Sequence, residues 1–299
     1  MTPLIECVPN FSEGRDLTVL AALREAVAGV TGVHLLDVHA DPWHHRSVFT
    51  FVGSPEAVEE AAFAAARIAV ERIDITKHHG EHPRMGALDV LPFVPLEGAR
   101  MTDCIALAAS TGARIADELR VPVFLYGRAA KRPERALLWA TRRSGLEWLS
   151  RRIGNDSAYA PDFGPRRVHP TAGATAVGAR PILVAYNILL DTADVGIAKE
   201  IAASIRTAGG GLRAVQARGF LVDGKAQVST NLLDIDVTSP TTVFEAVVAE
   251  AGDAGVRVLS SEIVGLAPER ALPRDAERVL RLGEPVEGKM LERRIAAAR

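Results

Sequence analysis

The residues best suited to chemistry lie together in the segment His78-His79-Gly80-Glu81-His82-Pro83-Arg84. An unperturbed imidazole titrates at a pH of about 6.5, so these histidines can exchange protons near neutrality. The apolar run from Leu88 to Val94 follows and is typical of a buried strand. A polar cluster that leads into a rigid strand is where catalytic groups are commonly held. We therefore expect proton-transfer chemistry at this segment.

Two other interpretations of the histidine cluster remain open at this stage. His78, Glu81 and His82 have the side chains of a metal site, but Gly80 and Pro83 interrupt the helix that a zinc protease would need. The segment is also compatible with a solvated polar turn. We expect no metal, because the ligands lack a regular helical frame.

The composition limits the classes of protein to consider. The chain has 299 residues, with 48% apolar and 24% charged residues, which is typical of a soluble globular protein with room for two domains. A net charge of -2 argues against nucleic-acid and membrane partners. Cys7 and Cys104 are the only cysteines, and no signal peptide or apolar span is evident. We expect a cytoplasmic protein.

The elements that must position the cluster follow a repeated order. Apolar periodicity predicts strands at 4–8, 33–38, 47–52 and 88–94, with helices at 17–27 and 55–73, and the loop Pro9 to Gly14 after the first strand. Thr102 is expected to cap a further helix to Leu119, before a strand at 121–126. Strands at 181–188, 212–220, 227–235 and 256–259, with helices at 194–207 and 240–251, repeat the pattern. The predicted fold class is α+β, with two ferredoxin-like β-α-β-β-α-β subdomains flanking a ligand groove.

A basic segment without clear periodicity separates the two halves. Residues 141–180 are rich in Gly, Pro and Arg, which suggests an anionic ligand, although a solvated linker has the same composition. We predict an N-terminal subdomain at 1–178, which includes this loop at about 141–178, and a C-terminal subdomain at 179–299.

Several ordered motifs carry a resemblance to a known family. They are Glu6-Cys7-Val8-Pro9-Asn10-Phe11-Ser12-Glu13-Gly14, Phe49 to Gly53, His78 to Val90, Pro161 to Pro165, Gly173 to Thr175, Gly178 to Arg180 and Gln227 to Leu232. Together they resemble the formiminotransferase family, folate-dependent enzymes of histidine breakdown. The resemblance implies transfer of a formimino group from N-formimino-L-glutamate to tetrahydrofolate. It implies no fused cyclodeaminase, because the sequence ends at Arg299.

The resemblance also assigns roles to residues. It places the general base at His82 and the folate contacts on Gly164, Pro165, Arg166, Arg167, Val168, His169, Pro170, Thr171, Ala172 and Gly173. Arg84, Asp37 and His39 are further catalytic candidates. Candidates for substrate binding are Asn10, Arg46, Lys77 and Arg180. Arginines suit these positions because donor and folate tail both carry carboxylates. Small-molecule partners and a homodimer are expected.

The sequence departs from the family pattern at several positions, so alternative functions remain open. Relatives usually have an acidic residue where this chain has His39, or an Asp-His-Asn-Arg run where it has Trp43-His44-His45-Arg46. Asp37 or Asp41 is then the candidate to orient His82, and Trp43 is expected to narrow the donor pocket. The alternatives are another donor such as formiminoglycine, a non-catalytic folate-binding protein, and a metal-dependent hydrolase.

Overall fold

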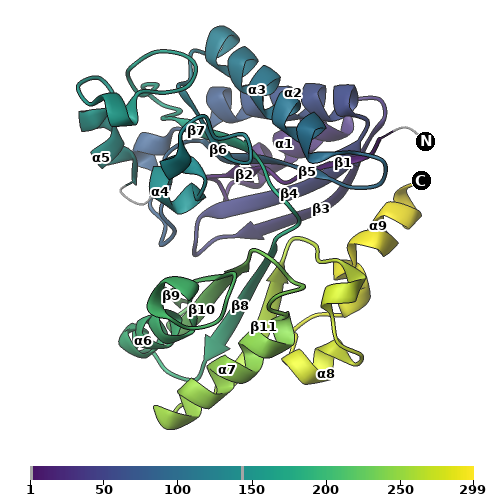
Figure 1. Ribbon diagram of the computed structural model, residues 1–299, viewed down its shortest axis with the longest axis vertical. Helices are drawn as coiled ribbons and strands as arrows, with labels where there is room; N and C mark the ends of the chain where they lie inside the picture. Colours follow the sequence, from purple (N-terminus) through teal and green to yellow (C-terminus); the bar gives the residue numbers. More distant parts are fainter. Residues whose placement is uncertain (1–2, 143–144) are drawn as a thin grey trace. The chain divides into compact units, whose positions relative to one another are not determined.

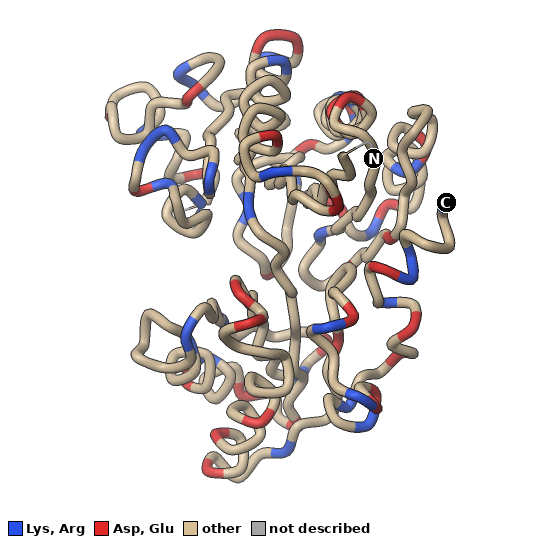
Figure 2. Tube along the Cα trace, turned by 45° about the vertical axis from the view of Figure 1, so that its right-hand side comes forward, with Lys and Arg blue, Asp and Glu red and all other residues tan. Residues whose placement is uncertain are grey.

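The computed structural model describes residues 3–142 and 145–299 of an α+β protein. The chain forms two compact units, Met1–Arg180 and Pro181–Arg299, each with its own sheet and apolar core (Figure 1). Positively and negatively charged residues alternate along the trace of both units (Figure 2), in keeping with the small net charge. Among the described residues, no helix has the length and apolar character needed to cross a membrane.

The sheet of the first unit is built around an interrupted first strand. Strands β1 (Ile5–Cys7) and β2 (Asn10–Phe11) both pair with β4 (Arg46–Gly53) and with β5 (Leu88–Pro95). The prediction that residues 9–14 form only a loop was therefore wrong, because the chain resumes pairing after Pro9, which has no N–H to contribute. Strand β3 (Val33–Asp41) lies at the outer edge beside β4.

The same sheet continues with the strand predicted at 121–126 and with one strand that was not predicted. β7 (Thr175–Ala179) runs parallel to both β5 and β6 (Val123–Gly127) and lies between them. The strand order is thus β3-β4-β1/β2-β5-β7-β6. The first β-α-β-β-α-β set matches the predicted element order, and two parallel strands extend it.

Three helices cover one face of this sheet: α1 (Leu17–Ala28), α2 (Pro55–Arg72) and α3 (Met101–Glu118). Ser54 caps α2 and Pro55 occupies its first turn. The predicted cap of α3 at Thr102 was wrong, because the helix begins at Met101 and its flanking residue is Arg100. The Asp103 carboxylate accepts the Arg100 amide at 2.8 Å and so fixes this earlier start.

The basic segment is more ordered than its sequence pattern indicated. It contains part of α4 (Leu138–Arg142), then α5 (Gly145–Arg152) and β7; Arg143 lies outside the described residues. Helix α5 buries only Leu146 and Leu149, too few apolar positions to reveal a helical period. Asp162 accepts the Leu125 amide of β6 at 2.8 Å, which ties the Pro161–Pro165 motif to the sheet, and it also pairs with Arg135 at 2.7 Å.

The second unit repeats the strand order in a simpler form. Its elements are β8 (Val184–Leu190), α6 (Val195–Ile205), β9 (Val215–Val222), β10 (Lys225–Leu232), α7 (Pro240–Asp253), β11 (Val258–Val264), α8 (Ala276–Leu280) and α9 (Leu291–Ala298). The sheet is antiparallel in the order β11-β8-β10-β9, with α6 and α7 packed on its apolar face. This is the split β-α-β arrangement.

Candidate active site

The loop that carries His82 is joined to two other segments by hydrogen bonds. The Ala87 amide donates to Ala172 O at 2.9 Å, and the Ala174 amide donates to Met85 O at 2.9 Å. The Ser12 hydroxyl donates to Gly86 O at 2.8 Å. A Cβ on Gly86 would lie 2.0 Å from Ala174 O, so glycine is required for this close approach. The predicted catalytic loop and folate segment are therefore neighbours.

His82 has the geometry of a base whose tautomer is fixed. Its Nδ1 lies 2.9 Å from Pro83 O, and a carbonyl can only accept, so Nδ1 carries the proton and Nε2 has the lone pair. Burial and the guanidiniums of Arg46 and Arg142 hold the pKa of His82 well below its usual value. The half-buried imidazole is therefore neutral at physiological pH, as a general base must be.

A buried carboxylate organises the positive charge near His82. Asp89 has no exposed side-chain area, and its Oδ2 accepts from both Arg46 and Arg142 at 2.7 Å. Its Oδ1 accepts the Met85 amide at 2.7 Å. Burial would raise the pKa of Asp89, but Arg142 and Arg46 outweigh it and keep the carboxylate charged. Two cations on one anion leave a net positive charge.

The same cluster includes further predicted substrate contacts. Arg46 also donates to Asn10 Oδ1, at 2.9 Å from Nη2. Burial lowers the pKa of Arg46 to about 10, with Asp89 opposing, so the group remains a cation at neutral pH. Arg180 bonds the Tyr126 hydroxyl, and burial raises the pKa of Tyr126 to about 12, so the phenol stays protonated. Such a cluster is suited to bind carboxylates.

Other predicted site residues have partners outside this cluster. Arg84 Nη2 donates to His78 O at 3.3 Å and to Glu147 at 3.1 Å, while its buried Nε has no hydrogen-bond partner among the described residues. Lys77 is 83% exposed and pairs with Asp74 at 3.1 Å, which directs its charge toward solvent.

The strand β3 carries the candidates that differ from the family pattern. Asp37 pairs with Thr50, and His39 pairs with Val48, across the β3–β4 ladder. The alternate β4 residues Phe49 and Phe51 enter the core on the helix side. Asp37 and His39 therefore lie on the opposite face of the sheet, away from the helices. In the described chain, no hydrogen bond reaches Asp37 Oδ2. Asp41 instead accepts the amides of Trp43 and His44 and shapes the hairpin turn. At Nδ1, His82 is oriented by the Pro83 carbonyl.

The predicted folate segment is a turn stabilised by its own histidine. His169 and Gly173 exchange backbone hydrogen bonds of 2.7 and 3.0 Å, and His169 Nδ1 accepts the Ala172 amide at 3.0 Å. Gly173 has φ +70°, and a Cβ there would lie 2.4 Å from Met85 O. Arg166 and Arg167 are exposed. The segment presents backbone and two exposed cations beside the His82 loop.

Three residues of the site were not singled out from the sequence. In the sequence, Asp89 is part of the His78–Val90 motif, Arg142 is one of several arginines of the basic segment, and Tyr126 belongs to a predicted strand. A lone acid inside the apolar run Leu88 to Val94 was the available signal, because a buried carboxylate requires partners.

Within the described residues, no group of three His, Cys, Asp or Glu side chains is arranged to hold a metal ion.

Fold and site together define a two-unit α+β protein with a neutral histidine beside a cationic cluster. Residues 4–180 match the family model of the formiminotransferase domain, N-terminal subdomain, and residues 185–283 match that of the formiminotransferase domain. The chain therefore belongs to the formiminotransferase family.

Curated relatives extend over most of the chain. A glutamate formimidoyltransferase from Streptococcus pyogenes is 44% identical over 94% of this chain and 95% of its own length. One from Thermoplasma acidophilum is 45% identical over 99% and 98%. The formimidoyltransferase-cyclodeaminase of Sus scrofa is 48% identical over 91% of this chain but only 51% of its own length.

Proposed function

We propose that the protein transfers the formimino group of N-formimino-L-glutamate to N5 of tetrahydrofolate, giving 5-formiminotetrahydrofolate and L-glutamate. The observation that carries this proposal is a neutral His82, with its tautomer set by Pro83, beside the Asp89–Arg46–Arg142 cluster. The names of the relatives support the same donor.

His82 acts twice in the proposed mechanism. The attacking nitrogen forms a bond to the formimino carbon, and His82 Nε2 accepts the proton that this nitrogen must lose. The bond from carbon to the glutamate nitrogen then breaks, and the His82 imidazolium donates the proton to that leaving nitrogen. A histidine with a lowered pKa suits both steps, because it is deprotonated before attack and a strong acid afterwards.

The arginines hold the donor during these steps. The Asp89–Arg46–Arg142 cluster has a net positive charge, and guanidiniums bind carboxylates through paired N–H groups. Asn10 fixes the second edge of Arg46 and leaves it less freedom to rotate. In our proposal these groups bind a carboxylate of formiminoglutamate and so place the formimino carbon near His82.

The turn at 164–173 is proposed to hold the folate. Its backbone adjoins the His82 loop, and Arg166 with Arg167 can reach the carboxylates of a folate tail. Replacing both arginines by Ala should weaken a polyglutamylated folate more than the monoglutamate. Equal weakening, measured by fluorescence titration, would place the tail elsewhere.

The donor is tested by direct comparison. Formation of 5-formiminotetrahydrofolate, followed by absorbance, should be faster with formiminoglutamate than with formiminoglycine, because glutamate adds a second carboxylate for the arginines. A higher kcat/KM with formiminoglycine would overturn the donor assignment. If neither donor gives product although folate binds, the protein is a folate-binding protein and not a transferase.

A further inference from the structure

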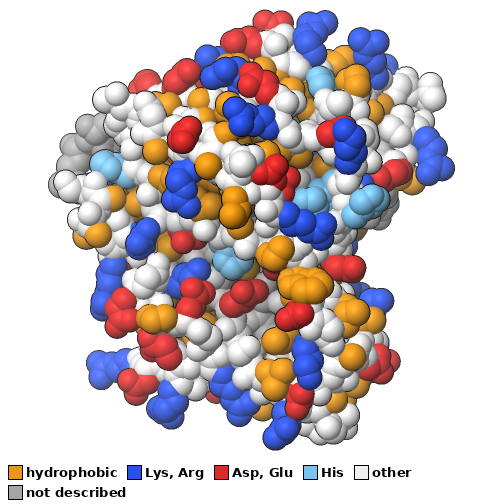
Figure 3. Space-filling model, turned by 180° about the vertical axis from the view of Figure 1, so that it is seen from behind, with side chains coloured by type: hydrophobic (Ala, Val, Ile, Leu, Met, Phe, Trp, Pro, Cys, Tyr) orange, Lys and Arg blue, Asp and Glu red, His pale blue; other side chains and the backbone are white. Residues whose placement is uncertain are grey.

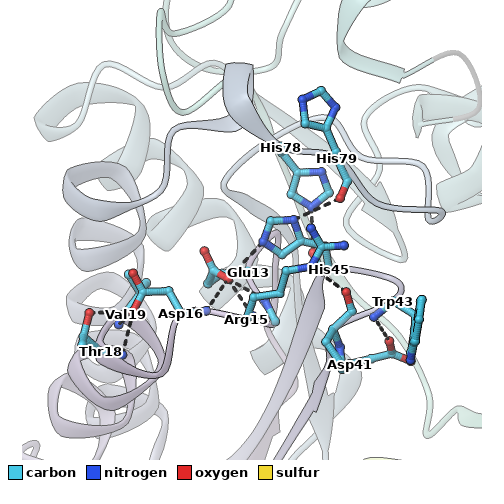
Figure 4. Close-up of polar contacts among 12 residues, drawn as sticks. Glu13, Arg15, Asp16, Thr18, Val19, Asp41, Trp43, His45, His78 and His79 are labelled. Atoms are coloured by element: carbon cyan, nitrogen blue, oxygen red, sulfur yellow. Dashed lines mark hydrogen bonds and ion pairs between the residues drawn. The ribbon is translucent and has the colours of Figure 1, made fainter. Parts of the chain in front are cut away.

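His45 lies at the junction of three loops, and two of its contacts limit its protonation state (Figure 4). Its Nε2 is 3.1 Å from the Glu13 carboxylate, and its Nδ1 is 3.3 Å from His79 O. Carboxylate and carbonyl oxygens only accept hydrogen bonds. A neutral imidazole has one N–H and can satisfy one of these acceptors, whereas an imidazolium satisfies both.

We propose that His45 is protonated on both nitrogens and acts as a positioning residue for this transferase. Its imidazolium donates to Glu13 in the loop before α1 and to His79 O in the loop that carries His82. We call these two contacts the His45 clasp. The His45 and Glu13 side chains are only 14% and 13% exposed, so the charge pair is largely shielded from water. The clasp is distinct from the Asp89 cluster, to which it connects through the neighbouring residue Arg46.

The other half of the clasp is a neutral ring. His78 stacks on His45 with ring centres 4.3 Å apart, and its Nε2 lies 2.7 Å from His45 O. That carbonyl requires an N–H on Nε2, so Nδ1 has the lone pair. Burial lowers the pKa of His78 to about 4, which keeps it uncharged against a cationic neighbour. A neutral ring stacked on a charged ring avoids repulsion.

Glu13 is held ready for the cation by its own loop. Its Oε1 accepts the amides of Gly14, Arg15 and Asp16 at 2.8 to 2.9 Å. Burial would raise the pKa of Glu13, but these amides and His45 outweigh it and keep the carboxylate ionised. The other charged or titratable groups around His45 are Arg15, Asp16, Asp41, Arg46, His78, His79 and Arg84.

Two glycines allow the three loops to close around His45. A Cβ on Gly14 would lie 2.3 Å from Asp41 O, and one on Gly80 would lie 2.4 Å from His44 O. His45 itself has φ +48°, a conformation that few side chains adopt. The turn between β3 and β4 is thus packed between the loop before α1 and the loop that carries His82. A substitution at His45 should therefore displace both Arg46 and the His82 loop.

The protonation of His45 can be observed without substrate, although the positioning role rests on the proposed reaction. Spectra of protein with ¹⁵N-labelled imidazoles should show two protonated nitrogens on His45 at neutral pH, and Glu13→Gln should remove one of them. A single protonated nitrogen in the parent protein, or an unchanged His45 signal in Glu13→Gln, would overturn the clasp. An inactive protein with the expected spectra would contradict the proposed function alone.

The pH profile separates positioning from simple structural support. In the parent protein kcat should fall at alkaline pH as His45 loses a proton and one clasp contact. His45→Asn should lower kcat by about tenfold to a hundredfold, the cost of a small misplacement, and should lack the alkaline fall. His34→Gln, a histidine of β3 without a clasp contact, is the control and should keep the parent profile. An alkaline limb retained in His45→Asn would overturn the role.

Discussion

The two units share a strand order but carry different chemistry on the sheet faces that their own helices leave uncovered. In the first unit this face carries His39 and Arg46, and Arg46 belongs to a charged cluster with Asp89 and Arg142. In the second unit, the β10 residues Gln227, Ser229 and Asn231 alternate with residues of the apolar core and therefore lie on the corresponding face. These three side chains are neutral amides and hydroxyls, and their neighbours across the sheet on this face include Arg218 and Glu262.

This difference shows that the fold does not determine the function of either face. Histidine side chains lie beside Lys and Arg side chains in the space-filling view of Figure 3. The repeated strand order supplies the same scaffold, whereas the inserted loop at 78–87 and the strands β6 and β7 occur in the first unit alone. We infer that proton transfer and anion binding belong to the first unit.

Removing the proposed base should give the largest effect. His82→Ala should lower kcat by about two to four decades, the usual contribution of a positioned acid–base group. Folate affinity should change little, because the turn at 169–173 keeps its own hydrogen bonds. Steady-state kinetics and a folate titration measure the two quantities. Near-normal turnover would move the catalytic centre away from the first unit.

Asp89→Asn should test the charged cluster through stability. The substitution leaves Arg46 and Arg142 facing each other without their shared anion. Breaking a buried ion pair in this way costs about 3–5 kcal/mol of unfolding free energy. Urea unfolding measures the loss. Full stability with normal activity would show that solvent can replace the carboxylate.

Arg46→Lys should test whether the cluster binds the donor. Lysine keeps the charge but cannot contact Asp89 and Asn10 at once, so kcat/KM for formiminoglutamate should fall by about tenfold to a hundredfold. Thermal unfolding of the variant provides the control. If only the KM for folate rises, the cluster binds the folate tail instead.

The second unit offers the contrasting change. Asn187 is 5% exposed, and its amide donates to Glu262 at 2.9 Å on the face of the second sheet that its helices leave uncovered. Asn187→Ala should cost about 1 kcal/mol of stability, because it removes a hydrogen bond from a buried amide to the half-buried Glu262 carboxylate. The acidic limb of kcat/KM should stay in place. A moved limb would mean that this face also influences the base.

The sequence predicted the strand order of both units because apolar periodicity and caps such as Ser54–Pro55 are local signals. It did not predict β2 or α5, where two to eight residues carry too little pattern, nor the pairing of Asp89 with Arg142. That pair joins positions 53 residues apart, and a basic segment does not reveal which arginine turns inward. The lowered pKa of His82 has causes that are likewise distant in the sequence, since burial and the charges of Arg46, Arg142 and His44 disfavour the imidazolium.

Arg142→Gln and His39→Asp should have the smallest effects, and their comparison tests which residues tune the pKa of His82. Burial and the positive charges of Arg46 and Arg142 disfavour the imidazolium, so the pKa of His82 is below its usual value. A base acts only when deprotonated, so kcat/KM should decline only at a pH below that of an ordinary histidine. Removing one guanidinium favours the imidazolium and should move the acidic limb upward by about one pH unit. His39→Asp, which adds a carboxylate on β3, should move the same limb upward by less. If His39→Asp moves it further than Arg142→Gln, the residue that tunes the base lies on β3 and the Asp89 cluster serves binding alone.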